Sequence, residues 1–162
     1  MSNYSVLMCV YEKDIDNAFI DAIDSLLPNK KYIKETIIVI NGFISEVKRK
    51  KIETEINNLK IIKVELPINV GISRALNIGL KRVSSDWVVR FDSDDICASN
   101  RFEIINKTIK KIGPEYDVIG TYIEEFDSES DHKIIRKVPL RFEDIKKNIL
   151  FSNPMNHVSV FF

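Results

Sequence analysis

Three carboxylates lie within four positions of the sequence, directly after an apolar stretch. The stretch is WVVRF at 87–91, and the carboxylates are Asp92, Asp94 and Asp95. Carboxylates held this close repel one another, which raises the pKa of at least one unless a cation lies between them. Residues i and i+2 of an extended chain point the same way, so Asp92 and Asp94 can converge on one ligand. This spacing predicts a site for Mg²⁺ or Mn²⁺, which combines one or two protein carboxylates with substrate phosphates.

The residues around the acidic segment allow one further role for it and disfavour several other kinds of site. Aspartates here are also suited to turns and helix caps. The helix expected over 99–113 has Ser99 or Asn100 as its candidate cap, and Asp95 is a further candidate. An EF-hand loop starting at Asp92 would need Gly at its sixth position, where the chain has Cys97. A phosphatase of the haloacid dehalogenase type matches poorly, because Ile96 stands where Thr or Val is usual. No Walker A loop or G-x-G-x-x-G fingerprint is present, which disfavours P-loop NTPases and Rossmann dehydrogenases.

The elements that must position this segment alternate along the chain. Apolar patterns predict strands at 4–11, 35–41, 59–66 and 86–91. Helical patterns follow them at 14–27, 44–57 (with Ser45 as N-cap), 71–83 and 99–113. Such alternation predicts right-handed βαβ units and a mostly parallel sheet, whose ligands gather beyond the carboxyl ends of the strands. The chemistry is therefore expected in the loops at 11–12, 41–42, 67–71 and 92–95.

The last part of the chain is less regular. Its patterns predict strands at 116–127 and 157–162, a polar turn at 128–133, an extended segment at 133–140 and a short helix at 141–151. The apolar residues at 158–162 end the sequence without a polar tail, so we expect them to expose apolar surface and favour self-association.

The composition is that of one globular domain over 1–162. Lys+Arg and Asp+Glu both number 24, so the net charge gives no indication of a nucleic-acid partner or a membrane surface. The apolar runs are too short to span a bilayer, and residues 1–10 do not have the pattern of a signal peptide. Two isolated cysteines, Cys9 and Cys97, do not form a disulfide framework, which makes a reducing cytoplasm the expected compartment.

Several segments, taken in order, resemble the nucleotide-sugar-binding part of family 2 glycosyltransferases, which have the GT-A fold. They are SVLMCVYEKD at 5–14, ETIIVINGFISE at 35–46, the long segment from LPINVG to NRFE at 66–103, and NPMNHVSVFF at 153–162. The resemblance covers nearly all of the chain. It implies a three-layer α/β/α architecture with a mostly parallel central sheet. It also implies a donor-binding half at 1–112 and the incomplete start of an acceptor half at 113–162.

For the nucleotide base, the resemblance implies contacts at two strand ends. Val10 and Tyr11 would line the base pocket, although strand packing also accounts for them, and Glu12 would belong to the nucleotide-sugar site. Asn41 stands where the family usually has an Asp that hydrogen-bonds the base, and Asn41 with the following glycine is equally suited to an ordinary turn. Arg74 would contact the base or a phosphate, or else lie on a solvated helix face.

For the sugar-diphosphate part of the donor and the metal, the resemblance implies contacts from the acidic segment at 92–95. Asp94 would ligate the metal directly, while Asp92 would contact the ribose or metal-bound water and serve as second metal residue. Ser93 would contact the nucleotide-sugar, and Gly71 would let the backbone approach it. Arg101, one helical turn further on, is expected to pair with the acidic cluster rather than to touch the substrate.

The reaction implied is displacement at the anomeric carbon with inversion. The sugar passes from a nucleotide-diphosphate sugar, with UDP-sugars first among the candidates, to a glycan or lipid-linked glycan acceptor in surface, capsular or O-antigen polysaccharide synthesis. In the family the general base usually lies in an acidic pair beyond the strand at 157–162. We therefore expect this chain to bind donor but to be weak or inactive alone, in the cytoplasm or at the inner face of the membrane. His157 is a candidate wall residue, although a lone His is more often structural.

Two other functions are compatible with part of this pattern. A nucleotidyltransferase also uses Mg²⁺ at strand-end carboxylates, but it would want a Gly-rich basic loop after the first strand, and VYEKDIDN at 10–17 has no Gly. A degenerate, non-catalytic nucleotide-binding module would bind nucleotide with metal and transfer nothing.

Overall fold

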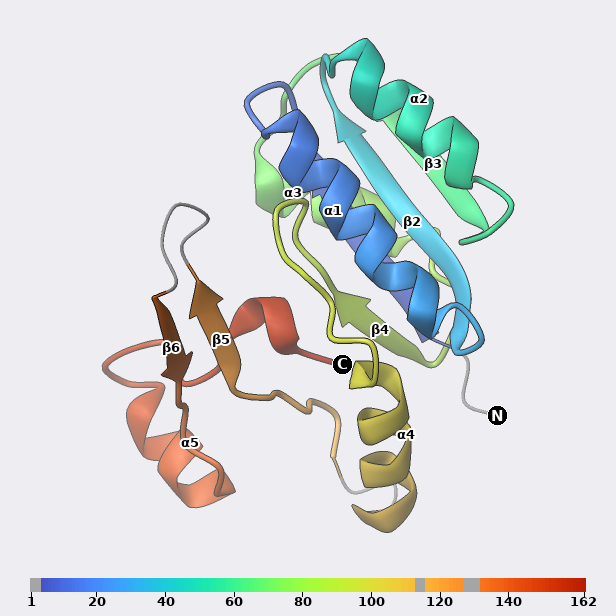
Figure 1. Cartoon of the computed structure of the whole chain (residues 1–162). Helices are drawn as coiled ribbons and strands as arrows, with labels where there is room; N and C mark the ends of the chain where they lie inside the picture. The colour runs from blue at the N-terminus through green and yellow to red at the C-terminus, as the bar shows by residue number, and fades with distance from the viewer. Residues whose placement is uncertain (1–3, 113–115, 127–131) are drawn as a thin grey trace.

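Four parallel strands form the central sheet of the computed structural model, which describes residues 4–112, 116–126 and 132–162. Their order is β3-β2-β1-β4 (Figure 1). The strands are β1 (Tyr4–Val10), β2 (Ile33–Asn41), β3 (Ile61–Leu66) and β4 (Trp87–Arg90), and the neighbouring pairs are all parallel. The predicted mostly parallel sheet is therefore confirmed, and the carboxyl ends of its strands share one edge.

Helices cover both faces of this sheet, which gives the three layers expected from the sequence. One core cluster joins the sheet to α1 (Asp16–Leu26), α2 (Glu46–Glu55) and α4 (Arg101–Ile112). The opposite face packs on α3 (Ile72–Leu80) through Leu7, Val39 and Ala75, among others. A short 3₁₀ turn, η1 (Leu27–Asn29), ends α1. The expected N-cap of α2 is confirmed, since the Ser45 hydroxyl accepts a hydrogen bond from the Lys48 amide at 3.2 Å.

The helix α3 approaches the sheet closely because it carries Gly79 on its buried side. A Cβ added there would lie 2.5 Å from Cγ2 of Val39 and 2.8 Å from Cδ1 of Leu7. Gly79→Ala is therefore expected to lower the free energy of unfolding by about 2 kcal/mol, because the clash outweighs the gain in helix propensity. Urea denaturation measures this, with the exposed Ser73→Ala of the same helix as control. Equal stability of the two variants would contradict the packing described.

The end of the chain closes the β4 edge of the sheet in a form that the sequence did not predict. Instead of a strand over 157–162, a 3₁₀ helix, η3 (His157–Ser159), precedes a short extended segment. The Ser159 hydroxyl donates to the carbonyls of Asn156 and Thr121, at 2.8 and 3.1 Å, and these bonds hold the turn. Phe161 then makes isolated antiparallel bridges to Val89 of β4 and to Ile119.

The expected apolar surface at 158–162 is present only in part, since Phe162 is 38% exposed but its neighbour is not. Phe161 is fully buried, with its ring edge-on to those of Tyr4 and Phe102 at centroid distances of 5.5 and 5.7 Å. Most exposed apolar side chains of this region gather on the antiparallel hairpin of β5 (Ile123–Phe126) and β6 (Lys133–Arg136) and around α5 (Phe142–Asn148). These elements extend away from the helix-covered sheet in Figure 1. The exposed apolar side chains of this region include Phe126, Ile134, Ile135, Leu140, Phe142, Ile149, Leu150 and Phe151.

Two expectations for this region are partly met. The strand predicted over 116–127 is shorter, beginning at Ile123, and Asp127 and most of the predicted polar turn lie outside the described residues. The predicted short helix at 141–151 is present as α5, over fewer residues. Among the helices of the described ranges, none combines the length and the apolar character needed to cross a membrane.

Candidate functional site

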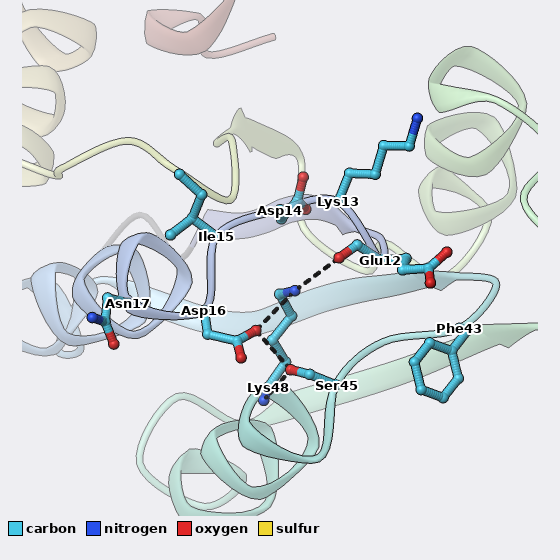
Figure 2. Close-up of a pocket in the computed structure, with 9 residues that line it drawn as sticks. All are labelled: Glu12, Lys13, Asp14, Ile15, Asp16, Asn17, Phe43, Ser45 and Lys48. Atoms are coloured by element: carbon cyan, nitrogen blue, oxygen red, sulfur yellow. Dashed lines mark hydrogen bonds and ion pairs between the residues drawn. The ribbon is translucent and has the colours of Figure 1, made fainter.

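Loops that follow β1 and β2 line an open cavity of about 480 Å³ at the carboxyl edge of the sheet (Figure 2). Of the residues expected at the nucleotide, Glu12 is the one in its lining. The remaining lining residues are Lys13, Asp14, Ile15, Asp16, Asn17, Phe43, Ser45 and Lys48. The cavity therefore lies between the start of α1 and the β2–α2 loop.

The Lys48 ammonium forms the inner wall of this cavity. Lys48 is 1% exposed, and its Nζ lies 3.0 Å from Oδ1 of Asp16 and 3.3 Å from the Glu12 carbonyl oxygen, to which it donates. Oδ1 of Asp16 also accepts a 2.7 Å hydrogen bond from the Ser45 hydroxyl. The hydrogen bonds from Ser45 and Lys48 hold the pKa of the Asp16 carboxyl below its usual value. The ion pair fastens α2 to the start of α1 and fixes the shape of the wall.

Asp14 connects this cavity to the acidic loop after β4. Its Oδ2 accepts hydrogen bonds from the Tyr11 amide at 3.0 Å and from the Ser93 hydroxyl at 2.8 Å. Burial raises the pKa of Asp14. The sequence analysis did not select this residue, although a carboxylate three positions after Tyr11 is well placed to accept a hydrogen bond from the loop backbone. The structure thus brings together Tyr11, Ser93 and a carboxylate that had been missed.

The Asp92 carboxylate lies between the Arg90 guanidinium and the His157 imidazole. Arg90 donates from Nε and Nη2 to Oδ1 of Asp92, at 2.9 and 2.6 Å. Nε2 of His157 lies 3.2 Å from Oδ2 of the same carboxylate. Arg90 was missed in the sequence, although the i, i+2 spacing that aligns Asp92 with Asp94 also aligns Arg90 with Asp92. His157, considered a candidate wall residue, does reach the acidic loop.

Asp94 and Asp95 differ in their surroundings. Asp94 is exposed, and no hydrogen bond to its carboxylate is present among the described residues. Asp95 is partly buried, and its Oδ2 has no hydrogen-bond partner in the described part of the chain. Burial, and then the charges of Asp92 and Asp94, raise the pKa of Asp95 to about 6. Asp94 is thus the carboxylate available to a ligand, and oxygen donors of this kind suit Mg²⁺ or Mn²⁺.

A complete protein-only metal site is not formed by these carboxylates. Within residues 4–112, 116–126 and 132–162, no three His, Cys, Asp or Glu side chains are grouped so as to hold a metal ion. Mg²⁺ commonly takes only one or two carboxylates and completes its shell with water and substrate phosphates. The donor set around Asp94 therefore fits a cation that arrives with a phosphate ligand.

Asn41 at the end of β2 is 3% exposed and is tied to the loop before α3. Its Nδ2 donates to Oδ1 of Asn69 at 3.0 Å, and its Oδ1 accepts from the Val70 amide at 2.9 Å. Oδ1 of Asn69 also accepts from the Gly71 amide at 2.9 Å. The Asn41 side chain also interacts with the nearby Cys9 thiol. Asn41 therefore has a structural role, which its position in place of the family's usual Asp did not indicate.

Replacing Asn41 by aspartate is expected to lower the free energy of unfolding by about 1 kcal/mol, because a carboxylate cannot donate to Asn69. A flip of the Asn69 side-chain amide would let Asn69 donate to the new carboxylate, but the Gly71 amide would then lose its acceptor, Oδ1 of Asn69. Chemical denaturation of Asn41→Asp measures the change, and the exposed Asn57→Asp is the matched control. A stabilised Asn41→Asp variant would argue against this hydrogen-bond arrangement.

The other residues expected at the nucleotide lie apart from the cavity lining. Val10 is fully buried and belongs to the core, as strand packing alone would require, whereas Tyr11 is 36% exposed. Gly71 has φ +82° at the N-terminus of α3, with open space where a Cβ would be. Arg74 is exposed in the first turn of the same helix. Gly71 and Arg74 belong to the element that packs on the opposite face of the sheet from α1 and α2.

Arg101 forms its described hydrogen bond and ring contacts with other groups than the expected carboxylates, although its charge and that of Asp95 interact. Its Nη2 donates to the Val158 carbonyl at 3.0 Å, and its guanidinium carbon lies 5.1 Å from the ring centroid of Phe161. Burial lowers the pKa of Arg101, while the charge of the nearby Asp95 acts in the opposite direction. The side chain therefore fastens the end of the chain beneath the acidic loop, where stacking on an aromatic ring and one carbonyl bond hold it.

Comparison with known proteins finds one family over almost the whole chain. The sequence profile of the family described as Glycosyl transferase family 2 matches residues 5–162. Over 160 residues the chain is 36% identical to the UDP-Gal:alpha-D-GlcNAc-diphosphoundecaprenol beta-1,3-galactosyltransferase of Escherichia coli, an alignment that covers 98% of this chain and 58% of that protein. It is 32% identical over 161 residues to the amylovoran biosynthesis glycosyltransferase AmsE of Erwinia amylovora, covering 98% of this chain and 59% of the relative. The chain thus spans less than two thirds of these relatives.

Solved structures with the same architecture are more distant in sequence. Residues 1–349 of S. aureus TarS, in complex with UDP-GlcNAc, superimpose with a TM-score of 0.67 at 20% identity, covering 85% of this chain and 37% of that chain. The mannosyltransferase PcManGT from Pyrobaculum calidifontis, in complex with GDP-Man and Mn²⁺, gives a TM-score of 0.61 at 18% identity over 73% of this chain and 34% of its own. At such identities the likeness establishes the fold, and it confirms the GT-A fold expected from the sequence.

Proposed function

The chain belongs to glycosyl transferase family 2, and from this premise we propose that it binds a nucleotide-diphosphate sugar for transfer to a glycan or lipid-linked glycan acceptor. The observation that carries the proposal is the exposed Asp94 carboxylate beside Asp92 and its Arg90 partner, at the same sheet edge as the cavity. Among the relatives, the E. coli protein is named for a UDP-Gal donor and a diphosphoundecaprenol-linked acceptor. This supports a UDP-sugar as donor and a surface polysaccharide or its lipid-linked precursor as product.

In this proposal the acidic loop receives the diphosphate of the donor together with Mn²⁺ or Mg²⁺. Asp94 ligates the cation directly. Asp92 keeps its carboxylate oriented through Arg90 and contacts the ribose or metal-bound water, while Ser93 fixes the loop through its bond to Asp14. When bound, the cation neutralises charge that builds on the leaving diphosphate, which is Lewis-acid catalysis. The Mn²⁺ complex of PcManGT, which is 18% identical over the aligned part, supports a divalent metal.

The transfer step proposed is displacement at the anomeric carbon with inversion. A carboxylate must then accept the proton of the acceptor hydroxyl as general base, and none of the residues described above is assigned this role. We propose that residues 1–112 supply donor binding and that 113–162 begin the acceptor side, so that these 162 residues bind donor and transfer weakly or not at all alone. The proposed compartment is the cytoplasm, at the inner face of the membrane where a lipid-linked acceptor would be available.

The proposal is tested by calorimetric titration of the purified chain with UDP, GDP, CDP and dTDP, with and without Mn²⁺. We expect one diphosphate, UDP first, to bind in a manner that needs the cation. Incubation of the chain with labelled UDP-sugars and a lipid-linked acceptor then separates donor binding from transfer. Binding of none of the four diphosphates at millimolar concentration, in the presence of Mn²⁺, would refute the donor site.

A further inference from the structure

One buried side chain, that of Asn29, holds the end of the acidic loop that leads into α4. Asn29 is 1% exposed and lies in η1, directly after α1. Its Nδ2 donates to the Ala98 carbonyl at 3.0 Å, and its Oδ1 accepts from the Phe102 amide at 3.4 Å. Phe102 is the second residue of α4, where backbone amides have no acceptor within the helix. Asn29 therefore fixes both the end of the loop and the start of the helix that follows.

The acidic loop has two more attachments to the same part of the chain. At its beginning the Ser93 hydroxyl donates to Asp14, which lies just before α1. Nearer its end the Cys97 amide donates to the Ser25 hydroxyl of α1 at 2.9 Å. The loop between β4 and α4 therefore runs beside α1 from the start of that helix to its end (Figure 1). Residues 94–96, with the exposed Asp94 among them, lie between these attachments.

The backbone at Asn29 is in turn fixed to the sheet. Pro28 lies in the first turn of η1, where its ring restricts φ. The Asn29 carbonyl accepts from the Tyr32 amide at 2.9 Å, and the Tyr32 carbonyl accepts from the Tyr4 amide of β1 at 2.9 Å. The strand β1 also pairs with β4, from which the acidic loop leaves the sheet. The Asn29 amide group is therefore a fixed point against which the loop is placed.

We propose that Asn29 is a positioning residue of the donor site, which sets the place of the acidic loop and through it the place of Asp94. The inference rests on the proposed function, because it takes Asp94 as the ligand of the cation. Mg²⁺ requires a near-octahedral shell, so a displaced carboxylate binds it less well. A loop released from Ala98 would also have to be ordered again when the cation and the diphosphate bind, which weakens binding.

Two substitutions of Asn29 separate its two hydrogen bonds. Asn29→Ala removes both. Asn29→Asp keeps an acceptor for the Phe102 amide at the N-terminus of α4, where negative charge is favourable, but has no N–H to donate to Ala98. Both variants are expected to weaken Mn²⁺-dependent binding about tenfold, as the loss of groups that orient a metal ligand commonly does. UDP and inorganic pyrophosphate should be affected equally, because both bind through the cation.

Gly79→Ala is the matched control for these variants. It is also expected to be destabilised, but it lies in α3, on the opposite face of the sheet from α1. Calorimetric titration with UDP and with pyrophosphate at fixed Mn²⁺ should therefore give wild-type affinity for Gly79→Ala. Circular dichroism checks that each variant is folded.

Hydrogen exchange of the backbone amides at 94–98 gives a second readout that needs no ligand. Release of the loop predicts that these amides exchange about tenfold faster in both Asn29 variants than in wild type. In Gly79→Ala the same amides should exchange no faster than its loss of global stability requires. The comparison separates a local effect on the loop from a general loss of stability.

The outcomes distinguish this inference from the function on which it rests. Affinities of the Asn29 variants no lower than that of Gly79→Ala, or unchanged exchange at 94–98, would overturn the positioning role and leave the donor site standing. Wild-type affinity in Asn29→Asp would show that the bond to Ala98 does not place the loop. If wild type itself binds neither UDP nor pyrophosphate with Mn²⁺, the proposed function fails and the positioning role fails with it.

Discussion

Replacing Asp94 by alanine is expected to weaken Mn²⁺-dependent UDP binding at least about 100-fold, because it removes the only ligand assigned to bind the cation directly. Asp92 cannot substitute for it, since both of its oxygens already face nitrogen groups of Arg90 and His157. The binding that remains should be the same with and without Mn²⁺. Since Asp94 is exposed and carries no hydrogen bond in the described part of the chain, the variant should unfold at the same denaturant concentration as wild type.

Asp86→Ala is the matched control for this experiment. Asp86 is also exposed, and it precedes β4 at the amino end of the strand, whereas Asp94 follows the carboxyl end. Calorimetric titration with UDP at fixed Mn²⁺ should therefore show wild-type binding for Asp86→Ala. Mn²⁺-dependent UDP binding that persists in Asp94→Ala would mean that other residues hold the cation. Equal losses in both variants would point to net charge rather than to a ligand.

Glu35→Ala is expected to lower the free energy of unfolding by about 2 kcal/mol, because the buried Ser5 hydroxyl and the exposed Ser84 lose their acceptor. Glu35 is 7% exposed, and its Oε1 accepts from the Ser5 hydroxyl at 2.6 Å and the Ser84 amide at 2.7 Å. Its Oε2 accepts from the Ser84 hydroxyl at 2.9 Å. This carboxylate joins β1, β2 and the segment that leads into β4 at the end of the sheet opposite the cavity.

The charge of Glu35 also makes stability depend on pH. Burial alone would raise the pKa of Glu35, but the hydrogen bonds from Ser5 and Ser84 hold it below the ordinary value of 4.5. A carboxylate whose pKa is lower in the folded state contributes stability that is fully present above the unfolded pKa and is lost as the pH falls through the folded pKa. Glu35→Gln keeps the shape without the charge, so wild type should exceed it in stability at pH 6 and lose that advantage below about pH 4.5.

Urea denaturation between pH 3 and pH 7 measures both effects. Glu53→Ala, which removes an exposed carboxylate from α2, serves as control and should stay within about 0.5 kcal/mol of wild type. A Glu35→Ala variant as stable as this control would show that the serine donors find other acceptors. A constant difference between wild type and Glu35→Gln over the whole pH range would contradict the lowered pKa.

The sequence by itself determined the layers of the fold and the place of the acidic loop. Apolar residues with the periods of strands and helices have one stable arrangement when they alternate, because each element must bury its apolar side against the next. The carboxyl ends of the strands then share an edge, which puts Asp94 and the loops after β1 and β2 together. The cap at Ser45 was also determined locally, since an N-cap bond spans only three residues.

Only the tertiary structure decided which side chains meet at that edge. The bonds of Asp14 to Ser93 and of His157 to Asp92 join residues 79 and 65 positions apart, and no local pattern specifies such pairs. The end of the chain shows the same limit, because an apolar period of two at 157–162 does not reveal that Ser159 turns the backbone or that Phe161 enters the core. Contacts of this kind depend on how loops and neighbouring elements share the remaining space, and that becomes defined only when the whole core is packed.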